Sequence, residues 1–395
     1  MGAGTSRAAY PVTAFTVGNA LGARTEDVLA ALRASRSGLA PCRLDLPFDT
    51  SCGAFPGPLD PVPAPLSSHD SRLARLALAV LDGAFASAVE RAARRWGRDR
   101  LAIVLGTSTG GILESERAFD AHARSGALPP DYDFERQHAF FALVEVVRAR
   151  TGAGGPAYVV STACSSSGKV LGAARRLLAA GVADAVLAGG ADTLCQTTLR
   201  GFASLEALSR RPCRPFGAER DGTSIGEGAA FLLVERAGDG PARLLGVGES
   251  SDAHHMSHPH PEGLGARLAM AEALRQAGLE PALVDHVNAH GTGTRANDGV
   301  EARAIAEIFG RAVPVASTKG YTGHLLGAAG ATEAVFAIFA LEHGFVPESL
   351  GAAPLDPEVG IDVCLERRAG RFRAVLSNSF GFGGSNVSVL LGAPA

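Results

Sequence analysis

The chain alternates between short, wholly apolar runs and longer segments whose apolar residues recur with a helical period. Apolar runs at residues 101–105, 158–160 and 185–188 predict strands, and the first and last of them end in glycines. Segments at 71–95 and 165–178 show the helical pattern. Short strands of this kind, interleaved with helices, are typical of α/β proteins. We therefore predict an α/β fold with buried sheets.

The second half of the chain loosely repeats the first. In the first half a strand leads through the Ser-Thr pair at 161–162 into a helix, and a Ser-Thr pair at 317–318 stands similarly before a helical segment at 325–341. A glycine-containing turn also precedes an apolar strand in each half. We predict two duplicated halves, residues 1–245 and 246–395.

The bulk composition restricts the class of protein. A length of 395 residues exceeds what one hydrophobic core usually supports, so two domains or one duplicated domain are expected. Hydrophobic residues make up 46% and charged residues 19%, which fits a large, well-buried enzyme core. The formal net charge of −3 gives no electrostatic case for nucleic acid, although a small acidic carrier could dock on a local basic patch.

Apolar runs and cysteine spacing both predict a cytoplasmic chain. No stretch reaches about 18 uninterrupted apolar residues, so the sequence predicts no transmembrane helix. Residues 40–66, rich in proline and small residues, are expected to form an irregular surface segment. The cysteines show no CxxC pair and no disulfide-like spacing, which predicts a reduced chain. They are Cys42, Cys52, Cys164, Cys195, Cys213 and Cys364.

Lysine is almost absent, although arginine is abundant. The chain has two lysines among 37 basic residues, and both lie five residues from a candidate catalytic group. Lys319 precedes His324, and Lys169 follows Cys164. A lysine carries a compact ammonium on a flexible stem, whereas arginine carries a wide planar fork. Either Lys319 does something that arginine cannot do, or two lysines survive by codon bias.

Cys164 lies between a predicted strand and a predicted helix. A thiol at a helix N-terminus gains from the helix dipole and from free backbone N–H groups, which lower its pKa and favour thiolate. The same N–H groups can hold an oxyanion. Many cysteines are instead buried and inert, but the small residues around Cys164 would let a substrate approach, which favours a nucleophile.

Two histidines occupy similar settings in the second half. His290 and His324 each lie in a glycine-containing turn at the end of a predicted element, where loops place functional groups. A lone histidine is more often structural. Two histidines with a cysteine, and no obvious asparagine partner, predict two hydrogen-bond donors that converge on one oxygen. That arrangement suits the stabilisation of an enolate better than the hydrolysis of an ester.

These residues resemble those of β-ketoacyl-acyl carrier protein synthases of the KAS I/KAS II type, in the thiolase superfamily. The resemblance covers nearly the whole chain, from the motif at 17–22 to the motif at 378–386. The motifs are individually short, but their order and spacing together are specific. The resemblance implies a thiolase-like fold whose two halves form five αβαβα layers, with the cysteine in the first half and the histidines and lysine in the second.

The resemblance also assigns roles to residues. It implies a catalytic set with supporting carboxylates, an oxyanion hole made by the backbone N–H groups of Cys164 and the gating Phe382, and a substrate and phosphopantetheine channel. The catalytic set is Cys164, His290, His324 and Lys319; the carboxylates are Asp298, Glu301 and Glu333; the channel residues are Thr292, Thr294, Thr109, Phe202 and Phe380.

The implied reaction is a decarboxylative Claisen condensation. An acyl chain on Cys164 would be attacked by the carbanion from malonyl-acyl carrier protein, giving 3-oxoacyl-acyl carrier protein. The resemblance implies no metal and no organic cofactor, because the substrates travel on the phosphopantetheine of the carrier. The implied partners are an acyl carrier protein and a second chain, in a homodimer or in a heterodimer with a related ketosynthase-like chain.

Some positions depart from the housekeeping enzymes of this family. Thr223 replaces an expected aromatic residue, and Thr109 stands where KAS II enzymes carry a bulky gate to the acyl pocket. Segments 161–169 and 251–263 are most similar to ketosynthases of aryl polyene pathways. This finer resemblance implies an aromatic or polyunsaturated acyl chain rather than a saturated one.

The sequence leaves three other interpretations open. The motif at 106–110 fits the G-x-S-x-G elbow of serine esterases, with Ser108 as the nucleophile. The dense histidines at 254–260 could bind a metal ion or could form a loop near the substrate entrance. The chain could also be an inactive chain-length partner, although such partners lack the nucleophile that Cys164 supplies.

Overall fold

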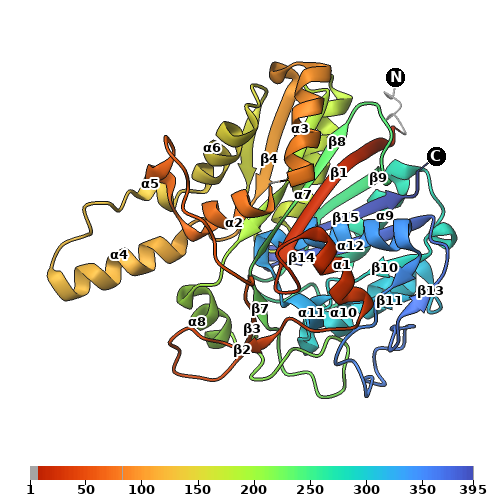
Figure 1. Ribbon diagram of the computed structural model, residues 1–395. Coiled ribbons are helices and arrows are strands. Elements are labelled where there is room, and N and C mark those ends of the chain that lie inside the picture. The colour runs from red at the N-terminus through yellow and green to blue at the C-terminus, as the bar shows by residue number, and fades with distance from the viewer. Residues whose placement is uncertain (1–7, 82, 395) are drawn as a thin grey trace.

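The computed structural model describes residues 8–81 and 83–394, which build a ten-stranded sheet flanked by helices (Figure 1). The strand order is β11-β10-β14-β15-β9-β1-β8-β6-β4-β5. In chain order these strands are β1 (Tyr10–Asn19), β4 (Leu101–Gly106), β5 (Ala157–Val160), β6 (Ala185–Asp192), β8 (Gly228–Glu235), β9 (Ala242–Ser251), β10 (His286–Asn288), β11 (Val315–Ala316), β14 (Ala374–Gly381) and β15 (Ser385–Gly392).

Two smaller sheets and the helices complete the molecule. The small sheets are β2 (Ala40–Pro41) with β3 (Ser51–Gly53) and β7 (Ile225–Gly226), and β12 (Phe345–Val346) with β13 (Arg368–Ala369). The α-helices are α1 (Thr25–Arg33), α2 (Arg72–Val80), α3 (Gly83–Trp96), α4 (Ile112–Ser125), α5 (Phe134–Gln137), α6 (Phe140–Thr151), α7 (Ser166–Ala179), α8 (Gln196–Ser204), α9 (Leu264–Ala277), α10 (Arg295–Phe309), α11 (Lys319–Thr322) and α12 (Ala329–His343). Short 3₁₀ turns are η1 (Ser67–His69), η2 (Arg98–Arg100), η3 (Pro281–Leu283), η4 (Leu326–Ala328) and η5 (Phe382–Gly384).

The large sheet consists of two five-stranded parts with the same pairing pattern. In the order β5-β4-β6-β8-β1 the first two pairs are parallel and the last two antiparallel, and β11-β10-β14-β15-β9 repeats this pattern. A short antiparallel pairing of β1 with β9, around Val12 and Ala242, joins the parts. The boundary predicted between residues 245 and 246 falls inside β9, and the division into two domains there stays a prediction.

Helices cover both outer faces and fill the space between the two parts. Helices α2, α3 and α6 contact the strands of the first part, and α9 contacts β9, β14 and β15 of the second. Helices α7 and α12 contact strands of both parts. All residues of α12 from Ala329 to Ala340 are buried, as expected for a helix that is apolar on every side. This is the thiolase-like αβαβα arrangement that the resemblance implies.

The sequence patterns located the elements but missed some of their ends. The helical pattern at 71–95 corresponds to two helices, α2 and α3. The strand predicted at 185–188 continues to Asp192. Gly190 lies within it at a close contact with the neighbouring strand, since a β-carbon there would lie 2.4 Å from the carbonyl oxygen of Gly106. Glycine therefore allows close strand packing here rather than ending the strand. The segment at 325–341 begins with the 3₁₀ turn η4 before α12 starts.

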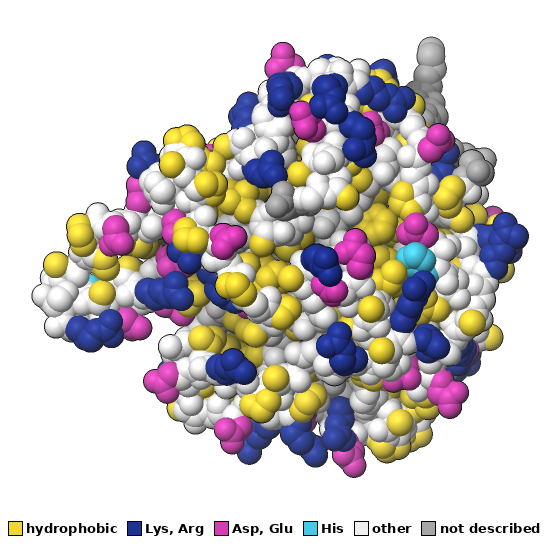
Figure 2. Space-filling view, in the orientation of Figure 1, with side chains coloured by type: hydrophobic (Ala, Val, Ile, Leu, Met, Phe, Trp, Pro, Cys, Tyr) yellow, Lys and Arg dark blue, Asp and Glu magenta, His cyan; other side chains and the backbone are white. Residues whose placement is uncertain are grey.

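Helix α4 and the chain that follows it form an arm that projects from the body (Figure 1). Exposed apolar side chains lie along this arm and at the start of α6: Phe119, Leu128, Phe134, Phe140 and Phe141. Basic and acidic side chains are interspersed over the face seen in Figure 2, and hydrophobic ones are visible along the arm. Within residues 8–81 and 83–394, no helix is both long and apolar enough to cross a membrane.

Candidate active site

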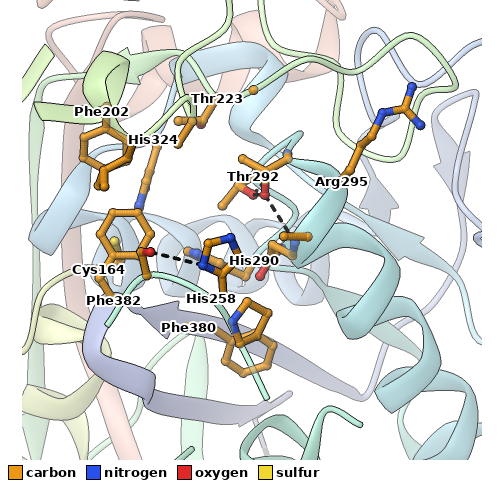
Figure 3. A pocket seen from close by; sticks show the side chains of 18 of the residues that line it. Cys164, Phe202, Thr223, His258, His290, Thr292, Arg295, His324, Phe380 and Phe382 are labelled. Atoms are coloured by element: carbon orange, nitrogen blue, oxygen red, sulfur yellow. Dashed lines mark hydrogen bonds between the residues drawn. The ribbon is translucent and has the colours of Figure 1, made fainter. Parts of the chain in front are cut away.

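A cavity of about 550 Å³ brings together groups from both parts of the fold (Figure 3). Cys164 reaches it from the first part, whereas His290, His324, Phe380 and Phe382 reach it from the second. The sequence predicted that cysteine and histidines meet where the halves join, and the structure places all three on this cavity.

Cys164 lies in a tight turn between β5 and α7. Ala163, immediately before it, has φ 52°, a left-handed conformation that a non-glycine residue adopts at a cost. The turn is fixed by Ser166, whose Oγ donates to the carbonyl of Ala163 (2.6 Å) and accepts from the amide of Thr162 (2.9 Å). The strained turn thereby holds the thiol just before the N-terminal end of α7, at the cavity wall.

The environment of the Cys164 thiol differs from the sequence prediction. Burial raises its pKa to about 11, although the backbone N–H of Phe382 and the positive charge of Lys319 both act in the opposite direction. The predicted lowering of the pKa is therefore wrong in its net sign, because desolvation outweighs the helix N-terminus. The resting group is a protonated thiol with an N–H of Phe382 directed at its sulfur.

The raised pKa predicts how alkylation of Cys164 depends on pH. Thiolate is the reactive form, so the rate of labelling by iodoacetamide should rise about tenfold per pH unit between about pH 7 and pH 10. Peptide mass spectrometry after timed labelling measures the rate for Cys164 separately from the other cysteines. A rate that levels off near about pH 8 would contradict the dominant effect of burial.

His290 and His324 both line the cavity, and their rings lie edge to face. Their ring centroids are 5.2 Å apart, and the ring planes are nearly perpendicular at 84°. Burial lowers the pKa of both rings well below the usual value, and the positive charge of Lys319 lowers it further. Both imidazoles are therefore neutral at pH 7. Three of their ring nitrogens, both of His324 and Nδ1 of His290, have no hydrogen-bond partner among the described residues.

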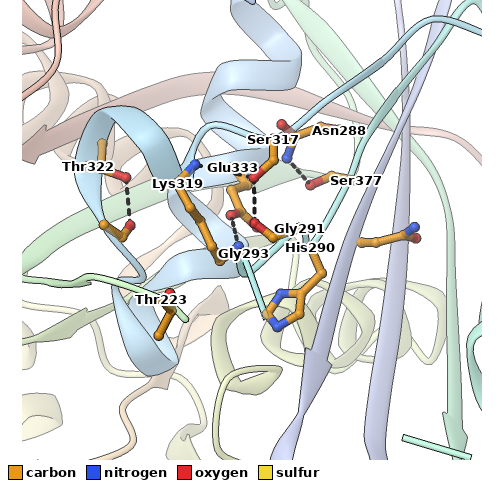
Figure 4. A network of polar contacts seen from close by, with 12 residues as sticks. Thr223, Asn288, His290, Gly291, Gly293, Ser317, Lys319, Thr322, Glu333 and Ser377 are labelled. Atoms are coloured by element: carbon orange, nitrogen blue, oxygen red, sulfur yellow. Dashed lines mark hydrogen bonds and ion pairs between the residues drawn. The ribbon is translucent and has the colours of Figure 1, made fainter. Parts of the chain in front are cut away.

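Lys319 is buried beside these rings (Figure 4). Its Nζ donates to Oε1 of Glu333 on α12, at 2.6 Å, and both side chains are almost inaccessible to solvent. The ammonium lies close enough to affect the thiol of Cys164 as well as both histidines. Lys319 thus adds to the effect of burial, which is the main cause of the lowered pKa of both imidazoles.

The other two predicted carboxylates bind backbone amides instead of the lysine. Glu301 accepts hydrogen bonds from the amides of His290 and Gly291, both at 2.7 Å. Asp298 accepts from the amides of Phe216 (2.8 Å) and Gly293 (3.1 Å). Of the three carboxylates to which the resemblance assigns a supporting role, Glu333 is the one that contacts Lys319 within the described residues. Glu301 and Asp298 fix the turn that carries His290.

Most of the predicted channel residues line the cavity. Phe202, Phe380, Thr292 and Thr294 all contribute to its wall. Phe202 stacks on Phe382 with ring centroids 5.3 Å apart, and the hydroxyls of Thr292 and Thr294 are 2.9 Å apart. Aromatic rings thus form the side of the cavity near Cys164, and hydroxyl groups form another part of its wall.

Thr109 is placed differently from the prediction. It does not belong to the wall of this cavity, and its Oγ1 donates to the buried carboxylate of Asp192 at 2.8 Å. The same carboxylate accepts from the hydroxyl of Thr107 and the amide of Ser108. Asp192 therefore orders the turn after β4. A role for Thr109 in admitting acyl chains stays a prediction.

The alternative readings of this region find little support. Ser108 has a buried hydroxyl without a partner among the described residues, and it does not line the cavity with the histidines. The structure thus gives it none of the geometry of a serine esterase. Within residues 8–81 and 83–394, no group of three or more His, Cys, Asp or Glu side chains is placed to hold a metal ion.

Part of the histidine-rich segment instead lines the cavity. His258 lines the cavity, and the backbone of this segment is tied to the Phe382 turn, since the amide of Gly383 donates to the carbonyl of Met256 at 2.7 Å. Arg295 and Asn297 also line the cavity and were not predicted. The density of histidines and the similarity of segment 251–263 to aryl polyene ketosynthases were the sequence signals for this segment, whereas nothing singled out Arg295.

The comparisons with known proteins agree with this geometry. Family models described as the N-terminal and C-terminal domains of β-ketoacyl synthase match residues 67–240 and 241–353. The chain is 34% identical over 413 aligned residues to 3-oxoacyl-[acyl-carrier-protein] synthase 2 of Coxiella burnetii, covering 96% of this chain and 97% of that protein. It is 41% identical to the mitochondrial 3-oxoacyl-[acyl-carrier-protein] synthase of Arabidopsis thaliana, over 62% of this chain and 58% of the relative.

Solved ketosynthase structures match this chain over all or nearly all of its length. The ketosynthase (ApeO) in complex with its chain length factor (ApeC) from Xenorhabdus doucetiae superposes with a TM-score of 0.89 at 37% identity, and both chains are fully covered. The ishigamide ketosynthase/chain length factor superposes with a TM-score of 0.89 at 28% identity, covering 98% of this chain and all of the other.

Proposed function

Because the chain belongs to the β-ketoacyl synthase family and is a 3-oxoacyl-acyl carrier protein synthase, we propose that Cys164, His290 and His324 carry its reaction. The observation that supports this most is the set of buried, neutral imidazoles with unpartnered ring nitrogens beside a thiol. Buried polar atoms normally have hydrogen-bond partners, and a carbonyl oxygen of a substrate would supply one.

In the first step an acyl group moves to Cys164. The sulfur attacks the carbonyl carbon of an acyl thioester, and the negative oxygen of the tetrahedral intermediate accepts hydrogen bonds from the backbone N–H groups of Cys164 and Phe382. The bond to the phosphopantetheine sulfur then breaks. The proton lost by the Cys164 thiol balances the one that the departing phosphopantetheine thiol gains, so no other co-reactant is needed.

In the second step malonyl-acyl carrier protein loses carbon dioxide. His290 and His324 donate hydrogen bonds to the malonyl thioester oxygen, where negative charge develops as the carbon–carbon bond breaks. The resulting carbanion attacks the acyl carbonyl on Cys164, which leaves as thiolate. Neutral rings suit this role, because each can donate one hydrogen bond without first losing a proton. Burial keeps the rings neutral, the charge of Lys319 lowers their pKa further, and Glu333 holds Lys319 in place.

Two variants test whether the histidines serve decarboxylation and not acyl transfer to Cys164. His290→Ala and His324→Ala should each slow release of carbon dioxide from malonyl-acyl carrier protein by on the order of a hundred- to a thousandfold, because each removes a donor to the developing oxyanion. Transfer of the acyl group to Cys164 should change far less. Carbon dioxide release and intact mass, measured on the same preparations, separate the two steps.

His286→Ala is the matched control for these variants. His286 is also a buried histidine, four residues before His290, but its Nδ1 lies 2.9 Å from the carbonyl oxygen of Pro314 and it does not line the cavity. Its removal should lower thermal stability without a selective loss of decarboxylation. Decarboxylation at the normal rate in both His290→Ala and His324→Ala would refute the proposed roles.

The proposed partners are an acyl carrier protein and a second ketosynthase-like chain. The similar structure from Xenorhabdus doucetiae is described as a ketosynthase in complex with its chain length factor. In this chain, exposed phenylalanines of the arm, including Phe119 and Phe134, and the sheet-edge strand β5 would suit burial against such a partner. We also propose an aromatic or polyunsaturated acyl chain as the substrate, as the aryl polyene resemblance implies.

A further inference from the structure

A second pair of cysteines lies outside the catalytic cavity, on the small sheet of β2, β3 and β7. Strands β2 and β3 are antiparallel, with Ala40 opposite Cys52 and the amide of Cys42 donating to the carbonyl of Thr50 at 2.9 Å. Cys42 and Cys52 are therefore diagonal neighbours on one face of this hairpin. Both line a separate cavity of about 460 Å³.

The two side chains are neighbours, and one of them is partly accessible. The thiol of Cys52 donates a hydrogen bond to the sulfur of Cys42, which also accepts from the backbone amides of Leu44 and Arg43. These donors lower the pKa of Cys42, and the same bond together with burial raises the pKa of Cys52. Cys42 is half-buried, whereas Cys52 is only 3% exposed. The exposed partner is thus the one that forms thiolate.

The other four cysteines, all within the described part of the chain, lack this arrangement. Cys195 hydrogen-bonds to Thr198, Cys213 donates to the carbonyl of Lys319, and burial raises the pKa of Cys364 to about 11. Cys164 has a similarly raised pKa. The partial exposure of Cys42, its position next to Cys52 and its lowered pKa therefore favour this pair as the first to react with an oxidant.

We propose that Cys42 and Cys52 form a thiol-oxidation site that closes to a disulfide and thereby slows the condensation reaction. With hydrogen peroxide as the oxidant, the Cys42 thiolate attacks one oxygen, the O–O bond breaks, and Cys42 sulfenic acid and water are formed. The Cys52 thiol then attacks this sulfur and expels a second water. The two cysteines lose two electrons and the peroxide gains them; an external dithiol reverses the step by exchange.

The bond cannot close without moving the hairpin. Cα atoms of diagonal neighbours on paired strands lie about 7–8 Å apart, whereas a disulfide spans about 4.4–6.8 Å. Strand β2 is two residues long and exposed, and β3 is buried against β7, so we expect β2 and the turn between them to move and strain to reach β3. Closure of the disulfide therefore moves the backbone of the hairpin and not only the two side chains.

Strand β3 connects this change to the catalytic site. Cys52 is paired with Ile225 in β7, and the amide of Gly226 donates to the carbonyl of His324 at 2.9 Å. A β-carbon at Gly53 would lie 2.0 Å from the carbonyl oxygen of Thr322, so β3 packs directly on the turn that precedes His324. Cys52 also packs in one apolar cluster with Phe202, whose ring stacks on that of Phe382.

The expected consequence rests on the proposed function of His324. A displacement of about 1 Å at a catalytic group can lower a rate on the order of a hundredfold. Oxidised enzyme should therefore condense at least about threefold more slowly than reduced enzyme and recover with dithiothreitol.

The test treats the full chain with increasing hydrogen peroxide and maps disulfides by peptide mass spectrometry under non-reducing conditions. We expect a Cys42–Cys52 linkage while Cys164 is still reduced, with loss of condensation that follows the linkage and reverses with dithiothreitol. Cys42→Ser and Cys52→Ser should lose both effects and keep the basal rate. Cys364→Ser, which removes a buried cysteine elsewhere, should behave like the unaltered chain.

Two results would overturn the proposal. Oxidation of other cysteines before this pair would refute the site, and a complete Cys42–Cys52 linkage with an unchanged rate would refute its connection to His324. If the reduced enzyme itself does not condense acyl chains, the proposed function fails instead. In that case disulfide mapping still tests whether Cys42 and Cys52 form the oxidation site. The rate of iodoacetamide labelling at Cys164, compared between oxidised and reduced protein, tests whether oxidation changes the catalytic cavity.

Discussion

Cys164→Ala should lose acyl-enzyme formation completely and lower condensation by on the order of a thousandfold or more. The variant keeps the cavity, both histidines and the backbone N–H groups at the sulfur, but it removes the only nucleophile among the cavity-lining groups that can form a thioester. Intact mass after incubation with an acyl-acyl carrier protein measures the acyl-enzyme, and product analysis measures condensation.

Cys364→Ala is the control that separates chemistry from packing. Cys364 is fully buried and burial raises its pKa to about 11, as for Cys164, but it lies outside the cavity and lacks the amide of Phe382. Both variants remove the same atom from a buried site, so similar thermal stabilities are expected. If Cys164→Ala still became acylated, another group would have to be the nucleophile.

Lys319→Arg should fold and yet condense about a hundredfold more slowly than the unaltered chain. Lys319 is 1% exposed and its ammonium fits between Glu333 and the catalytic rings. Arginine keeps the charge but adds volume and a planar fork, which should cost roughly 1–3 kcal/mol of stability in a close-packed interior. The substitution would also displace the positive charge that acts on Cys164, His290 and His324, together with the side chains packed around it.

Lys169→Arg is the matched control, because it makes the same substitution at the other lysine. Lys169 is half-buried near Glu249 and Arg176, outside the catalytic cavity, so a longer side chain can be accommodated. Condensation rate and melting temperature are measured for both variants. Turnover near normal in Lys319→Arg would mean that the scarcity of lysine reflects codon bias and not a requirement of the site.

The catalytic groups were predictable because their surroundings are local. Cys164, His290 and His324 each lie in a turn of small residues at the end of an element, and these turns are visible in the sequence. The repeated order of strands was also visible, because the two parts of the sheet use similar patterns of apolar runs. Local patterns therefore predicted the fold class and three residues that the structure places on one cavity.

Other features depend on contacts between distant segments and were missed. The choice of Glu333 as the partner of Lys319 depends on how α12 packs between the two parts of the sheet, and Asp298 and Glu301 appeared equally suitable in the sequence. The sign of the pKa shift of Cys164 depends on complete burial, which the turn alone does not reveal. Thr109 was placed by resemblance, whereas its hydroxyl binds Asp192, 83 residues further along.

The Cys42–Cys52 pair is another feature that local sequence patterns did not predict. The segment at 40–66 was predicted to be irregular, and its cysteine spacing gave no indication of a disulfide. The structure forms two short strands within it, β2 and β3, and their register brings the two sulfurs together. Pairing that involves so few residues leaves no periodic signal in a sequence.

The most direct test of the account is a single turnover on acyl-enzyme isolated from its acyl donor. Enzyme carrying an acyl group on Cys164 is mixed with malonyl-acyl carrier protein, and intact mass, carbon dioxide and the carrier-bound product are followed together. The account predicts that the acyl mass leaves the enzyme as one equivalent each of carbon dioxide and 3-oxoacyl-acyl carrier protein appears. Formation of 3-oxoacyl product while Cys164 keeps its acyl group would contradict it.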